Sequence, residues 1–231
     1  MKSDFIRILA LRTLGNFLVL FSLYMISWIF YKPALEEVKY FYNQVIGKRY
    51  VAVGEESPQF VAPENEGPKG LLGQALHINE VEVLVPKDPN FSIIVPKLGA
   101  NANIMPNVDA ANPQQYMAAL EAGVAQAAGS KFPGEGGHIY LFAHSTNTFA
   151  NVSRYNAVFY LLYKLEPADE INLYYHGVRH KYSVTGKAVV DPSEVDYITR
   201  KTDREFLTLQ TCWPPGTVAK RMLVFAEPAA R

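Results

Sequence analysis

The only cysteine of this 231-residue chain, Cys212, stands where an apolar run gives way to a loop. The run before it, residues 205–211, is apolar or β-branched at most positions and predicts a short strand. Prolines and a glycine follow at positions 214–216, and proline lacks the N–H that a strand ladder needs. Residues 221–226 predict the next strand, which begins with Arg221. If the two strands pair as a hairpin, we expect thiol and guanidinium to be neighbours at one end of it.

These residue types are suited to covalent acyl transfer. The thiolate is the nucleophilic form of cysteine, and a nearby positive charge favours it. Arginine stays charged at ordinary pH and offers a fork of donors that suits a developing oxyanion. His144 follows the apolar run 139–143, so we expect it at another strand end as a proton carrier. Nucleophile, general acid/base and charge stabiliser together suffice for this chemistry.

Each member of this trio also has a plainer interpretation. A lone cysteine often packs in a core as a small, inert hydrophobic residue. An arginine at a strand end is often a solvated surface group. The remaining histidines do not suggest a metal site, because zinc needs three or four ligands at close spacing and the sequence shows no such cluster. We therefore expect no metal and no cofactor.

The amino-acid sequence around the trio resembles that of the sortase family of membrane-anchored cysteine transpeptidases. Cys212 ends the motif TLQTC, Arg221 follows nine residues later, and His144 lies upstream at the end of an apolar run. The similarity extends from about residue 78 to residue 231. Three further stretches carry it: IIVPKLGANANIMPNV (residues 93–108), EAGVAQAAGSKFPGEGGHIYLFAHS (121–145) and LEPADEINLYYHGVRHKYSV (165–184).

The resemblance implies an eight-stranded β-barrel with its active site in a groove at the strand ends. Cys212, His144 and Arg221 would be the catalytic residues. Ala143 stands where the family usually has glycine, and Ser145 begins a pair that replaces a frequent Arg-Asp, so the subclass and the substrate pocket stay open. The candidates for substrate binding flank the histidine and the cysteine: Ala143, Ser145, Thr211 and Trp213.

The resemblance also implies an activity. Sortases cleave an LPxTG-like sorting signal near the C-terminus of surface proteins through a thioacyl enzyme, and transfer the product to an amine on the cell envelope or on another protein. Two alternatives remain. One is another cysteine peptidase or hydrolase, although neither a caspase-like nor an L,D-transpeptidase-like context surrounds Cys212. The other is a non-catalytic, membrane-tethered binding domain. A formal net charge of zero without a basic block or stripe gives no sign of nucleic-acid binding.

The N-terminal region predicts a single membrane span. Residues 14–31 are 18 residues without a charge, and at ~1.5 Å per residue such a helix spans about 27 Å, close to the apolar thickness of a bilayer. A buried helix and a cleaved signal peptide are the alternatives. Lysines and arginines flank the span on both sides, so their count leaves its orientation open. The resemblance implies that the domain after the span lies outside the cytoplasm.

We predict three parts along the chain. Residues 1–32 are a short tail and the transmembrane helix. Residues 33–75 hold an amphipathic helix, or an extension of the spanning helix, and a flexible stalk rich in Gly, Pro and Glu. Residues 76–231 are a mainly β domain: many short strands with turns between them and few helices predict a closed or nearly closed barrel. Its main helix is expected to begin at Asn112 and end near Ala128.

Overall fold

The structure, a computed structural model, describes residues 2–54, 81–145 and 158–229. The chain divides into two units, Met1–Lys39 and Tyr40–Arg231. The first is helical where it is described, and the second contains the strands.

Helix α1 (Lys2–Ile46) is continuous over 45 residues. Its segment Phe5–Trp28 has a mean hydropathy of 1.6 and exposed side chains, and it is long and apolar enough to cross a membrane. This is the one such helix in the described part of the chain. The segment overlaps the predicted span at residues 14–31 and is consistent with a single-pass membrane anchor. The helix predicted from Pro33 is an extension of α1. Most of the predicted stalk lies outside the described residues.

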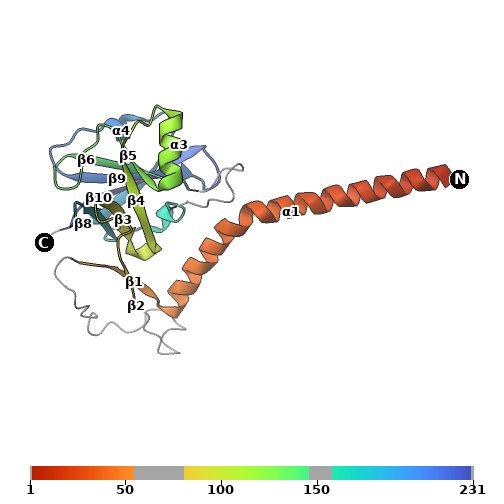
Figure 1. Cartoon of the computed structure of the whole chain (residues 1–231), viewed down its shortest axis with the longest axis horizontal. Coiled ribbons are helices and arrows are strands. Elements are labelled where there is room, and N and C mark those ends of the chain that lie inside the picture. Colours follow the sequence, from red (N-terminus) through yellow and green to blue (C-terminus); the bar gives the residue numbers. More distant parts are fainter. Residues whose placement is uncertain (1, 55–80, 146–157, 230–231) are drawn as a thin grey trace. The chain divides into compact units, whose positions relative to one another are not determined.

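Eight strands close into a barrel, which confirms the predicted fold (Figure 1). Around the barrel the order is β10-β8-β7-β3-β4-β5-β6-β9. A closed barrel leaves no strand edge unpaired, and its strands can fill the centre with apolar side chains. The strands are β3 (Phe91–Val95), β4 (Ala100–Val108), β5 (Val124–Ala127), β6 (His138–Phe142), β7 (Glu170–Tyr175), β8 (Val178–Val190), β9 (Phe206–Trp213) and β10 (Lys220–Pro228).

The three strands that carry the candidate catalytic residues are neighbours in this barrel. β9 pairs in parallel with β6 and antiparallel with β10. Side chains alternate along a strand, and one face of the three strands is mostly apolar. Its apolar members are buried in the main core: Ile139, Leu141, Leu207, Leu209, Met222, Val224 and Ala226. Thr211 lies on this same face, whereas Tyr140, Gln210 and Cys212 lie on the opposite one.

Helix α3 (Pro113–Ala122) contacts β4 and β5. Its start is as predicted, because the Asn112 side chain accepts hydrogen bonds from two backbone N–H groups of the first turn. Its predicted end near Ala128 is wrong: the helix ends at Gly123, and the next four residues are the buried strand β5. A Cβ at Gly123 would lie 2.4 Å from the carbonyl oxygen of Asn103, so the close approach of this turn to β4 requires glycine.

The segment that follows α1 packs on the barrel. β1 (Arg49–Ala52) pairs in parallel with β2 (Val81–Leu84) in a separate two-stranded sheet. Beyond β1, the hydroxyl of Tyr174 on β7 donates a hydrogen bond to the carbonyl of Val53. Within the described residues the remaining helices are short: η1 (Pro96–Leu98), η3 (Leu162–Lys164) and α4 (Asp196–Thr199).

Candidate active site

Cys212 and Arg221 face each other across the hairpin of β9 and β10. The antiparallel register pairs the two residues directly, and directly opposite side chains share a face with Cβ atoms about 5 Å apart. One guanidinium nitrogen, Nη1, donates to the carbonyls of Val218 and Lys220 at 3.1 Å each. These bonds hold the guanidinium at the turn end of the hairpin, where Cys212 also lies.

His144 reaches the same end of the barrel through the pairing of β6 with β9. The register sets Phe142 beside Gln210, and two bonds extend the contact past the end of β6. The N–H of Ala143 donates to the carbonyl of Gln210 at 3.1 Å. The hydroxyl of Thr211 donates to the carbonyl of Ala143 at 3.0 Å. Because β6 and β9 are parallel, His144 and Cys212 lie at the same end of the two strands. The structure thus brings the predicted trio to one end of three adjacent strands.

The four residues predicted to bind substrate occupy two kinds of position. Ala143, Ser145 and Thr211 are buried. The bond between Thr211 and Ala143 fastens β9 to the segment that carries the histidine. Trp213 is half-buried, and its ring lies 5.2 Å from that of Tyr163 between centroids. Trp213 directly follows Cys212, and both rings pack against the main core. Contact of these four residues with a substrate stays a prediction.

Burial dominates the electrostatics of the candidate nucleophile and base. It raises the pKa of the Cys212 thiol above its ordinary value, and the Arg221 guanidinium partly opposes this by favouring the thiolate. Burial lowers the pKa of His144, and the Glu121 carboxylate on α3 partly opposes that shift. Both directions favour the uncharged form at pH 7. Burial therefore works against a thiolate–imidazolium pair in the free protein, and Arg221 and Glu121 work for it.

Sequence reasoning missed a polar pair on the face that carries Cys212. The hydroxyl of Tyr140 on β6 donates to Oε1 of Gln210 on β9 at 2.5 Å. Burial raises the pKa of Tyr140, while the positive charge of Arg221 acts in the opposite direction. Strand alternation was the available signal, since Gln210 is two residues before Cys212 and Tyr140 four before His144. Glu121 was also missed, because its place near His144 depends on how α3 packs.

The described residues contain no group of three or more histidine, cysteine, aspartate or glutamate side chains that could hold a metal ion. The candidate groups at this strand end are a thiol, an imidazole and a guanidinium. Groups of these kinds can form and break an acyl–sulfur bond.

Comparisons with known proteins all point to one family. The family model of the Sortase domain matches residues 93–229. Sortase D of Bacillus subtilis (strain 168) is 26% identical over 136 residues, which cover 58% of this chain and 60% of that protein's length.

Two solved structures agree with the sequence matches. Sortase C-1 from Actinomyces oris aligns with a TM-score of 0.51 at 28% identity, over 63% of this chain and 76% of that one. Sortase C from Clostridium perfringens, solved with the C-terminal cell wall sorting motif, aligns with a TM-score of 0.51 at 26% identity. That alignment covers 61% of this chain and 70% of the other.

Proposed function

The chain belongs to the sortase family, and we propose that it is a membrane-anchored cysteine transpeptidase with Cys212 as nucleophile, His144 as general acid/base and Arg221 as oxyanion donor. The observation that carries the proposal is that these residues lie at one end of three adjacent strands, where β6 and β9 end and β10 begins. His144 is far from the other two in sequence, and the parallel pairing of β6 with β9 supports its place beside them.

The proton transfers start from an uncharged thiol and imidazole, the forms that burial favours. As the Cys212 sulfur attacks the scissile carbonyl carbon, the imidazole of His144 accepts the thiol proton. A carbon–sulfur bond forms, and the carbonyl oxygen becomes an oxyanion that accepts hydrogen bonds from Arg221. When the intermediate collapses, the carbon–nitrogen bond breaks and the imidazolium gives its proton to the leaving amine. The product is a thioacyl enzyme with a neutral histidine.

The second half of the reaction reverses these roles. An incoming amine attacks the thioester carbonyl carbon, and His144 accepts a proton from the attacking nitrogen. Arg221 again donates to the oxyanion. The carbon–sulfur bond then breaks, the leaving sulfur takes the proton back from the imidazolium, and the new amide departs. The free thiol and the neutral imidazole are restored.

The substrate is proposed to be a C-terminal LPxTG-like sorting signal on surface proteins, and the acceptor an amine on the cell envelope or on another protein. The related sortase C from Clostridium perfringens, solved with a cell wall sorting motif, supports this substrate class. We place the barrel outside the cytoplasm, with Phe5–Trp28 as the single span. An enzyme held at the membrane stays close to substrates held there, which raises their effective concentration.

We also propose that the chain has three parts. Residues 1–32 would form the tail and anchor, residues 33–75 the connection, and residues 76–231 the catalytic barrel. The described packing of Tyr174 on Val53 adds part of the connection to the barrel unit.

Mass spectrometry of the intact protein tests the nucleophile directly. The full chain is incubated with an LPxTG peptide, and wild type should gain the mass of the thioacyl fragment. Cys212→Ala should show no such adduct, while His144→Ala should trap little of it because the thiol proton has no acceptor. An adduct that persists in Cys212→Ala would place the nucleophile elsewhere. Complete absence of turnover and of iodoacetamide labelling in wild type would favour a non-catalytic binding domain.

A further inference from the structure

The residue that follows Cys212 contacts a segment that takes no part in the proposed reaction. Residues 158–169 are the described part of the connection between β6 and β7. The Tyr163 ring in this segment contacts the ring of Trp213, the residue next to Cys212, at 5.2 Å between centroids. Whatever holds Tyr163 in place therefore also holds the ring of the residue that follows Cys212.

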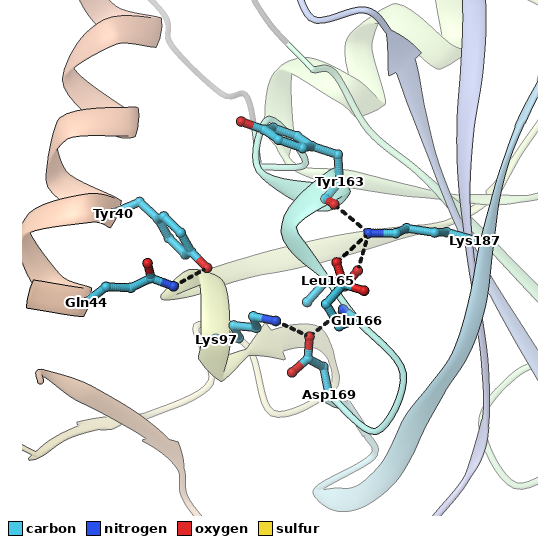
Figure 2. Close-up of polar contacts among 8 residues, drawn as sticks. All are labelled: Tyr40, Gln44, Lys97, Tyr163, Leu165, Glu166, Asp169 and Lys187. Atoms are coloured by element: carbon cyan, nitrogen blue, oxygen red, sulfur yellow. Dashed lines mark hydrogen bonds and ion pairs between the residues drawn. The ribbon is translucent and has the colours of Figure 1, made fainter. Parts of the chain in front are cut away.

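Lys187 of β8 is the main polar contact of this segment (Figure 2). Its ammonium donates to the carbonyls of Tyr163 and Leu165 at 2.8 Å each, and to Oε1 of Glu166 at 2.9 Å. An ammonium group has three donors, and these acceptors match them one for one. The carbonyls belong to the end of η3, where the last carbonyls of a helix lack partners within the helix. Charge-assisted bonds to such carbonyls are stronger than bonds between neutral groups.

The far end of the same segment has its own anchor. Oδ2 of Asp169 accepts from the ammonium of Lys97 on η1 at 2.7 Å and from the backbone N–H of Glu166 at 2.6 Å (Figure 2). With Asp169 fixed to η1, the bonds from Lys187 hold the part of the segment closer to the candidate active site.

The Tyr163 ring is also contacted by its neighbour in the sequence. The ammonium of Lys164 lies 4.8 Å from the centroid of the Tyr163 ring and 5.3 Å from that of Tyr40, near the end of α1. These are distances at which a cation is attracted to a ring. Ring contacts of this kind tolerate sliding, whereas hydrogen bonds to two carbonyls fix the backbone. Together with the buried leucines on either side of Tyr163, these backbone bonds limit where the ring can go.

We propose that Lys187 is a positioning residue for the substrate groove: by binding the carbonyls of Tyr163 and Leu165, it holds the Tyr163 ring against Trp213 and sets the wall beside Cys212. The expected effect of Lys187 on substrate binding rests on the proposed function. Its effect on the position of the Tyr163 ring depends on the fold alone. Because Lys187 touches neither Cys212 nor His144 in the described contacts, its loss should weaken peptide binding more than the chemical steps.

Lys181 provides a matched control on the same strand. It forms an ion pair with Glu170 at 2.6 Å and is more exposed than Lys187, with 53% against 30% of the side chain accessible. Replacing either lysine by methionine keeps the unbranched stem and removes the charge and the donors. Only Lys187→Met removes hydrogen bonds to residues 158–169.

The experiment uses the full chain with Trp28→Phe, which leaves Trp213 as the only tryptophan of the two in the sequence. In this background, Lys187→Met should increase acrylamide quenching of Trp213 fluorescence at least about twofold. It should also raise KM for an LPxTG peptide by about three- to tenfold while kcat stays within about twofold, because a displaced wall affects positioning before chemistry. Lys181→Met should match the background in both measurements. Lys187→Arg, which keeps charge and donors, should restore much of the quenching protection.

Two outcomes overturn the inference. The first is a Lys187→Met protein that melts cooperatively yet equals Lys181→Met in quenching and in KM. The second applies if Lys187→Met does not fold: Glu166→Gln, which alters one acceptor, should then still raise quenching by a smaller step, and no change there rejects the role. If no variant cleaves peptide, the proposed function fails, but the quenching comparison still decides whether Lys187 holds the wall.

Discussion

The candidate catalytic groups and the wall beside them are held by different kinds of bond. His144 and Cys212 stand where β6 and β9 end, and Arg221 stands where β10 begins, so backbone ladders between these strands fix their relative positions. Tyr163 lies on a connection between strands. Buried leucines pack this connection on the core, and bonds from Lys187 and ring contacts hold it further. A ladder distributes its constraint over many backbone bonds, whereas the connection is held by side chains.

This difference predicts two classes of variant. Substitutions within the trio should change the chemistry and leave the fold intact, because the ladders do not use those side chains. Substitutions in the bonds that join one element to another should change geometry, and with it either stability or substrate binding. Activity and stability, measured on the same variant, distinguish the two classes.

The largest effect is expected for Arg221→Lys. A point charge cannot reproduce the fork of donors at the oxyanion, so kcat/KM for an LPxTG peptide should fall about 10²- to 10³-fold. The melting temperature should stay close to that of wild type, since the pairing of β9 with β10 is between backbones. Peptide kinetics and calorimetry check the two parts. Loss of activity together with loss of cooperative melting would mean that Arg221 is a structural residue.

Labelling with iodoacetamide separates the charge of Arg221 from its shape. The guanidinium favours the thiolate, so it lowers a pKa that burial has raised. Arg221→Met removes that help, and the pH at which Cys212 is half-labelled should move upward. Arg221→Lys keeps the charge and should label much as wild type does. A downward shift in Arg221→Met would contradict the assigned electrostatics.

Thr211→Val tests the bond that joins the histidine segment to β9. The variant keeps the shape of the side chain but leaves the buried carbonyl of Ala143 without the hydroxyl that donates to it at 3.0 Å. Loss of one partner of a buried hydrogen bond costs about 1–3 kcal/mol of unfolding free energy. Because the same bond positions His144, kcat should fall as well. Urea unfolding and peptide kinetics measure the two effects.

Thr185→Val is the matched control for that variant. The Thr185 hydroxyl donates to the carbonyl of Phe225 at 3.3 Å, on exposed residues of β8 and away from the trio. Water can replace the lost donor there, so stability and kcat should change little. Equal losses in both variants would remove the special role of the bond between Thr211 and Ala143.

The same contrast explains how far the sequence alone could be interpreted. Strand ends and turn residues predicted the barrel and placed Cys212, His144 and Arg221 at strand ends, because alternation and proline are local signals. The end of α3 was wrong for a reason outside local sequence. Alanines favour helix in isolation, but residues 124–127 pair with β4 and β6 as strand β5. Burial in the barrel outweighed the local preference.

The parts of the site that the sequence did not reveal depend on contacts between distant elements. Lys187 is one of two lysines in an alternating strand, and nothing in its sequence neighbours indicates three acceptors on a connection more than twenty residues earlier. Glu121 likewise resembles an ordinary surface residue of a helix. Its relation to His144 appears only when α3 is packed on β4 and β5.

The smallest expected effect is the one that Glu121 exerts on His144. Burial lowers the pKa of the imidazole, and the carboxylate partly restores it, so Glu121→Gln should lower the pKa further. The acidic limb of the pH profile of kcat/KM should then move to lower pH, since the neutral imidazole that accepts the thiol proton persists further into acid. Titration of the His144 ring protons by NMR measures the same shift in the free protein. Glu227→Gln, on the exposed end of β10, should leave both curves unchanged, and an upward shift in Glu121→Gln would show that the carboxylate does not act on this histidine through its charge.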